Sequence, residues 1–156
     1  MKNLWSVIMV AMVLSLVGNR ADAHCEIPCG IYDDAARLAE LAEHATTIEK
    51  SMTMIRSLSG ETKRDEADEN QLVRWVNNKE IHASAIQEIV SDYFLTQRIK
   101  PVEPGDEAAA ARYHKELALL HKMLVNAMKA KQTVEIGYVE TLRTLINEFS
   151  DSYMGE

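Results

Sequence analysis

The chain has 156 residues and carries a formal net charge of −7 at pH 7. This acidic balance argues against nucleic acid or an acidic membrane surface as a partner. Its only two cysteines are Cys25 and Cys29, so no disulfide framework holds the fold together. The length suits one domain with a sizeable hydrophobic core.

The N-terminal 23 residues are typical of a secretory leader. Lys2 precedes an apolar run over residues 4–17, and Ala-Asp-Ala at residues 21–23 forms a small-residue cleavage site. The apolar run is too short and too close to that site to favour a membrane span. We therefore expect residues 1–23 to be a removed signal peptide. The mature protein is then exported, to the periplasm or outside the cell, and has no membrane partner.

Cleavage after Ala23 would turn the next few residues into a candidate metal site. His24 would become the N-terminal residue, so that a free α-amine, an imidazole and the thiols of Cys25 and Cys29 lie within six residues. The amine has a reference pKa of about 7.7–8.0 and is available as a neutral nitrogen near neutral pH. Nitrogen and sulfur donors in a plane suit nickel(II) or copper(II) better than zinc, which prefers a tetrahedron. The segment 24–32 is therefore a candidate metal-binding hook with a redox role.

The rest of the chain, residues 33–156, predicts helices only. The first runs over 33–59, capped by Asp33 or Asp34 and stopped at Gly60. Its apolar residues recur at alternating three- and four-residue steps, which is typical of a helical seam; they are Leu38, Leu41, Ala45, Ile48, Met52 and Ile55. A charged stretch follows over 61–70, and we expect its first half to be a loop.

A second helix is expected from about Asp68 to Arg98, ended by the prolines and glycine at residues 101–105. Two polar residues interrupt its apolar stripe. We expect Lys79 to extend its amino group outward, and His82 to be either a satisfied core histidine or part of a site.

Two further helices complete the expected fold. Asp106 caps the third, and a turn near residues 130–133 leads into the fourth. Their apolar stripes are Tyr113, Leu117, Leu120, Leu124 and Ala127/Met128, then Tyr138, Leu142, Leu145/Ile146, Phe149 and Tyr153. The pattern predicts an all-α four-helix bundle that follows the N-terminal metal-binding hook.

The hook sequence His24-Cys25-Glu26-Ile27-Pro28-Cys29-Gly30-Ile31-Tyr32 resembles the nickel hook of the nickel-containing superoxide dismutases. The resemblance is specific over residues 24–40 and weaker over 74–94. It implies a four-helix bundle assembled as a homohexamer, with a nickel ion in each subunit. It also implies that superoxide is disproportionated to oxygen and hydrogen peroxide while nickel cycles between the +2 and +3 states.

The resemblance implies ligands and nearby side chains as well. His24 would bind nickel through its amine and imidazole, Cys25 through its amide nitrogen and sulfur, and Cys29 through its sulfur. Tyr32 and Tyr93 are similar to the two tyrosines that lie beside the metal, and they are the expected catalytic residues.

Two outer residues would orient the His24 imidazole: Glu40, as a hydrogen-bonding carboxylate, and His82, at a position that is Arg or His in relatives. The chain departs from the family pattern at Glu26, where relatives have Asp, and in its export leader. It is also about one helical turn shorter between His82 and Tyr93.

Other interpretations of the same residues remain. The chain could be an exported nickel- or copper-binding or delivery protein without catalysis. It could also be a helical interaction module in which Cys25 and Cys29 form a disulfide. His44, His114 and His121 have no ligand-like neighbours in the sequence, and we expect them at the surface or in an interface.

Overall fold

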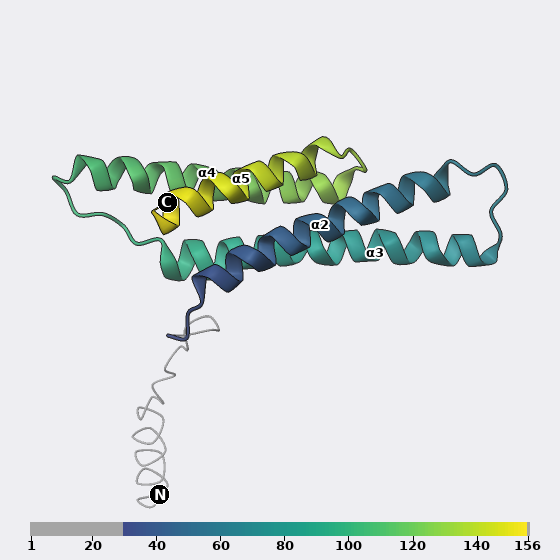
Figure 1. The fold of residues 1–156 in the computed structure, drawn as a ribbon, viewed down its shortest axis with the longest axis horizontal. Coiled ribbons are helices and arrows are strands. Elements are labelled where there is room, and N and C mark those ends of the chain that lie inside the picture. Colours follow the sequence, from purple (N-terminus) through teal and green to yellow (C-terminus); the bar gives the residue numbers. More distant parts are fainter. Residues whose placement is uncertain (1–29, 156) are drawn as a thin grey trace, which may run out of the picture.

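The computed structural model describes residues 30–155 of the chain. These residues form a bundle in which the chain reverses direction at each loop between helices (Figure 1). The helices are α2 (Asp34–Ser59), α3 (Glu66–Glu88), the π-helix η1 (Ile89–Arg98), α4 (Glu107–Gln132) and α5 (Gly137–Met154). α2 pairs with α3 and α4 with α5, and the two hairpins pack through α3 against α4 and α2 against α5. Within this range there is no strand, which confirms the all-α four-helix prediction. No helix of the described residues is long and apolar enough to span a bilayer.

The first helix follows its sequence pattern closely. The carboxylate of Asp33 accepts a hydrogen bond from the Ala36 amide at 3.0 Å, so Asp33 caps α2, and Gly60 follows its last residue. This cap satisfies one of the free amides at the start of the helix. All six residues of the expected seam are buried, and all but Ile55 belong to the hydrophobic core cluster.

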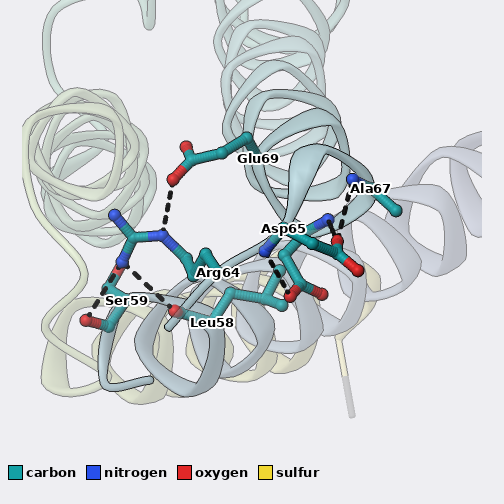
Figure 2. Close-up of polar contacts among 7 residues, drawn as sticks. Leu58, Ser59, Arg64, Asp65, Ala67 and Glu69 are labelled. Atoms are coloured by element: carbon teal, nitrogen blue, oxygen red, sulfur yellow. Dashed lines mark hydrogen bonds and ion pairs between the residues drawn. The ribbon is translucent and has the colours of Figure 1, made fainter. Parts of the chain in front are cut away.

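The connection between α2 and α3 is set by polar contacts of Arg64 and Asp65 (Figure 2). The Asp65 carboxylate accepts from the amides of Ala67 and Asp68, and the Asp68 side chain accepts from the Asp65 amide. Arg64 donates to Glu69 at 2.7 Å and reaches back to the last carbonyls of α2. This capping box starts α3 at Glu66, two residues before the expected start. The expected loop in the first half of the charged stretch is confirmed.

The second helix does not stay α-helical to its expected end. Residues 89–98 form η1, and the Ile99 amide donates to the Phe94 carbonyl, five residues back, at 2.9 Å. Such π segments are rare and often occur at functional sites. Phe94 is fully buried and meets Phe149 edge-on at a centroid distance of 4.9 Å, which fixes η1 against α5.

Lys79 lies inside the bundle, so the expectation of an outward amino group was wrong. Its residue is 3% exposed, and its Nζ donates to the carbonyl oxygens of Ala130, at 2.6 Å, and Lys131. Glu80 accepts a third bond at 3.0 Å. The last carbonyls of a helix have no partner within the helix, and a cation suits that end. Lys79 therefore ties α3 to the C-terminal end of α4.

The expected stripe of α5 is confirmed at Leu142, Leu145, Ile146 and Phe149, whereas that of α4 is confirmed only at Leu120 and Ala127. Asp106 caps α4 as expected, but the helix continues to Gln132, so the turn occupies residues 133–136 instead of 130–133. Tyr113, Leu117 and Leu124 are only partly buried, and Met128 is exposed. The fully buried positions of α4 and α5 belong to a wider face that contacts two neighbours; they are Leu120, Met123, Ala127, Ala130, Val139, Leu142 and Phe149.

Candidate metal centre

The expected nickel ligands His24, Cys25 and Cys29 lie outside the described residues. The description begins at Gly30, whose φ of 73° lies in the left-handed region that favours glycine. Tyr32 follows two residues later, immediately before the cap of α2. The described part of the chain therefore leads from the hook into the end of the bundle where α2 begins and α5 ends (Figure 1).

The structure brings together the two tyrosines that sequence similarity singled out. The rings of Tyr32 and Tyr93 meet edge-on, with centroids 5.9 Å apart and planes at 74°. Tyr32 is 40% exposed, whereas Tyr93 is 3% exposed. Aromatic pairs in this geometry are mutually stabilising. Tyr93 thus forms a buried support for the partly exposed ring of Tyr32, the last residue of the expected hook segment 24–32.

A carboxylate that the sequence did not single out organises this end of the bundle. Asp34, the first residue of α2, accepts from Tyr93 Oη at 2.6 Å and from Tyr153 Oη at 2.9 Å. Arg98 donates to both carboxylate oxygens, from Nε at 2.8 Å and from Nη2 at 2.6 Å. Asp34 therefore joins α2, η1 and α5 through charge-assisted hydrogen bonds.

These contacts shift the pKa values of Asp34, Tyr93 and Tyr153. Burial opposes ionisation of Asp34, but the hydrogen bonds from Arg98, Tyr93 and Tyr153 outweigh it and hold the Asp34 pKa below its ordinary value. Burial and the bond to Asp34 raise the pKa of Tyr93 to about 12. Burial and the same carboxylate also raise the pKa of Tyr153. At neutral pH the carboxylate is ionised and both phenols keep their protons.

Replacement of Asp34 by Asn is expected to remove a stabilisation that depends on pH. The folded-state pKa is lowered from 3.8, so the ionised carboxylate stabilises the protein above that pH and the benefit disappears as the pH falls through the folded-state value. The Asn side chain would also place its amide NH2 group, a donor, against the donor groups of Arg98. We expect a loss of about 1–3 kcal/mol in the free energy of unfolding at pH 7, measured by urea unfolding.

The difference between Asp34→Asn and the unchanged protein should begin to shrink below about pH 4, where the unfolded chain takes up a proton at Asp34, and should disappear only once the pH falls below the lower folded-state pKa. Asp151→Asn, which changes an exposed carboxylate on α5, provides the control and should leave stability nearly unchanged. A difference for Asp34→Asn that stays constant from acid to neutral pH would contradict this account.

A second cluster joins Glu40 and His82 through His44. Glu40 pairs with Arg37 at 2.6 Å and lies 3.8 Å from His44 Nε2. The Nδ1 atoms of His44 and His82 are 2.8 Å apart, so the two rings share a hydrogen bond. His44 is not a freely exposed surface residue, because its side chain is largely buried and contacts both Glu40 and His82.

Burial lowers the pKa of His44, and the neighbouring His82 ring lowers it further, although Glu40 and Glu43 oppose the change. Two imidazoles at this distance disfavour a double positive charge. The lowered pKa favours the uncharged form of His44 near neutral pH.

The described residues offer no metal site of their own. Between residues 30 and 155, no three His, Cys, Asp or Glu side chains are grouped so that they could hold a metal ion. The expected donors of His24, Cys25 and Cys29 precede that range, and their nitrogen and sulfur atoms fit nickel(II) by ligand type.

A helical bundle with paired tyrosines beside an N-terminal segment rich in nitrogen and sulfur donors belongs to the class of helical metalloproteins. The family model of the nickel-containing superoxide dismutases matches residues 19–156, and the chain belongs to that family. The protein is thus a nickel superoxide dismutase, an oxidoreductase that uses nickel and acts on superoxide. No curated protein and no solved structure matches the chain significantly.

Proposed function

We propose that this superoxide dismutase is exported and holds its nickel at the N-terminus that leader removal creates. His24 would bind through its amine and imidazole, Cys25 through its amide nitrogen and sulfur, and Cys29 through its sulfur. Nickel bound there supplies a one-electron couple between the +2 and +3 states. The family match carries this proposal, because it begins at residue 19 and so includes all three ligands. One nickel per subunit and a homohexamer follow the family pattern.

Tyr32 and Tyr93 have different roles in this proposal. Tyr32, which is partly exposed and ends the expected hook segment, would limit which molecules approach the metal, and Tyr93 would hold the Tyr32 ring in place. The hydroxyl proton of Tyr93 is directed to Asp34, and its pKa of about 12 disfavours release. Disproportionation of two superoxide ions consumes two protons, and water at the exposed face of Tyr32 supplies them more readily than Tyr93.

The Glu40–His44–His82 cluster would orient the His24 imidazole from the outer shell. Ligating histidines usually give their second ring nitrogen to a carboxylate or another acceptor, which fixes ring angle and tautomer. Glu40 is half-exposed and keeps acceptor capacity beyond its bond to Arg37. His82 would act through His44 or on the hook directly, and the contact between the two rings supports a shared role.

The proposal is tested with protein that begins at His24, is loaded with nickel and is assayed for superoxide removal per bound metal. We expect activity well above that of free nickel, and its loss in Cys25→Ser and in Cys29→Ser. Protein loaded with copper provides the comparison for a metal-delivery role. Tight metal binding without activity in either form would contradict the proposed site and favour delivery.

A further inference from the structure

Arg98 is placed between the carboxylate of Asp34 and the ring of Tyr32. Two parallel bonds, Nε to Oδ1 at 2.8 Å and Nη2 to Oδ2 at 2.6 Å, fix the guanidinium in the plane of the carboxylate. Its central carbon lies 4.3 Å from the centroid of the Tyr32 ring. A planar guanidinium can bind a carboxylate at its edge and stack on an aromatic ring with its face, which an ammonium group cannot do.

The remaining contacts of Tyr32 are weaker than this stack. Its hydroxyl donates to Gln97 Oε1 at 3.4 Å, a long hydrogen bond, and its edge meets Tyr93. The Tyr32 residue precedes the first helix and is 40% exposed, so no helical backbone fixes its side chain. Arg98 is therefore the principal contact that can hold the plane of the ring.

The π-helix explains how Arg98 reaches this position. In an α-helix, side chains five residues apart point about 140° away from each other, given 3.6 residues per turn. Hydrogen bonds between residues five apart widen the turn and bring such side chains nearer to one face. Tyr93 and Arg98 are five residues apart in η1, and both donate to Oδ1 of Asp34.

We propose that Arg98 is the positioning residue for Tyr32: clamped by Asp34, its guanidinium fixes the plane of the tyrosine ring. The proposal rests on the function proposed above, in which Tyr32 stands beside the bound metal. Loss of the guanidinium then frees the ring while the three metal ligands stay intact. Turnover falls because the freed Tyr32 ring no longer limits which molecules approach the metal, although nickel is still bound.

The test compares Arg98→Met, Arg98→Lys and Arg143→Met in nickel-loaded protein kept reduced. Arg143 is a matched control because, like Arg98, it pairs with a carboxylate of α2: it joins α5 to Glu49, and its side chain has a similar partial exposure. The first readout is the ring signal of Tyr32 in protein with ¹³C-labelled tyrosines, assigned with Tyr32→Phe. The second readout is the turnover number per bound nickel.

We expect both Arg98 variants to move the Tyr32 signal toward that of a mobile, exposed tyrosine and to lower turnover about tenfold or more. Lysine should not rescue, because it restores the charge without the flat, forked group. Arg143→Met should leave the signal and the turnover unchanged. An unchanged Tyr32 signal in folded Arg98→Met, or full rescue by lysine, would overturn the proposal.

The two proposals fail in different ways. Should the unaltered nickel-loaded protein lack activity, the proposed function fails, but the ring signal still decides whether Arg98 holds Tyr32. If Arg98→Met does not fold, as judged by circular dichroism, Arg98→Lys carries the comparison, since it keeps the positive charge beside Asp34. Equal movement of the Tyr32 signal in Arg143→Met would count against a specific role for Arg98.

Discussion

Addition of one alanine before His24 is expected to reduce the dismutase activity of the nickel-loaded protein to that of free nickel. The extra residue turns the free α-amine into a peptide amide, which can bind a metal only after it loses its proton, so the neutral amine donor of His24 is lost. Loss of outer-shell partners alone costs about 10–100-fold in metal affinity or activity, and loss of a direct ligand costs more. Activity per bound nickel and total bound nickel are measured together.

The same alanine placed after Glu156 is the control, because it changes mass and composition equally and leaves the N-terminus free. This variant should keep full activity. N-terminal sequencing of protein from its source cells completes the test, and we expect it to begin at His24. Full activity in the chain with the added N-terminal alanine would show that the α-amine is not a ligand.

The helices could be predicted from sequence where a single apolar stripe faces the core and residue types mark the ends. α2 is such a case, since Asp33 caps it, Gly60 follows it, and its seam is buried as expected. η1 could not be predicted, because a change from α to π hydrogen bonding leaves no mark in an apolar stripe. The change depends instead on how Phe94 and Tyr93 pack against the other helices.

The candidate site also has one part that could be predicted from the sequence and one part that could not. The hook could be recognised because its donor atoms lie within six consecutive residues. The contacts of Asp34 with Arg98 and Tyr153 join residues 64 and 119 positions apart, and they depend on the register of three packed helices. No local pattern encodes such a register.

Polar residues on an apolar helix stripe were one further signal of specific contacts in the sequence. Lys79 and His82 both interrupt the stripe of the second helix, and both have specific partners in the structure. The sequence allowed a satisfied core histidine at His82, but for Lys79 an outward amino group was expected, so the buried partners that its ammonium requires were not foreseen. It could not show which partners, since the carbonyls that Lys79 binds depend on where α4 ends.

Replacement of Phe94 by Ala is expected to lower the free energy of unfolding by about 3–5 kcal/mol. Phe94 is fully buried and meets Tyr93, Phe149 and Tyr153 edge-on at centroid distances of 5.0, 4.9 and 5.6 Å. Its removal leaves a cavity and deletes three aromatic contacts, of which the two with Phe149 and Tyr153 join η1 to α5. Urea unfolding at one protein concentration measures the change, because assembly would add to apparent stability.

Two variants show whether the loss comes from the cavity. Phe94→Leu keeps much of the volume and should cost less than Phe94→Ala, whereas Val73→Ala, at a 58% exposed position on α3, should cost little. A loss below about 1 kcal/mol for Phe94→Ala would mean that the site closes around the smaller side chain. Because Tyr93 packs on Phe94 and supports Tyr32, the cavity should also loosen the tyrosine pair. Dismutase activity should then fall at temperatures where the protein is still folded.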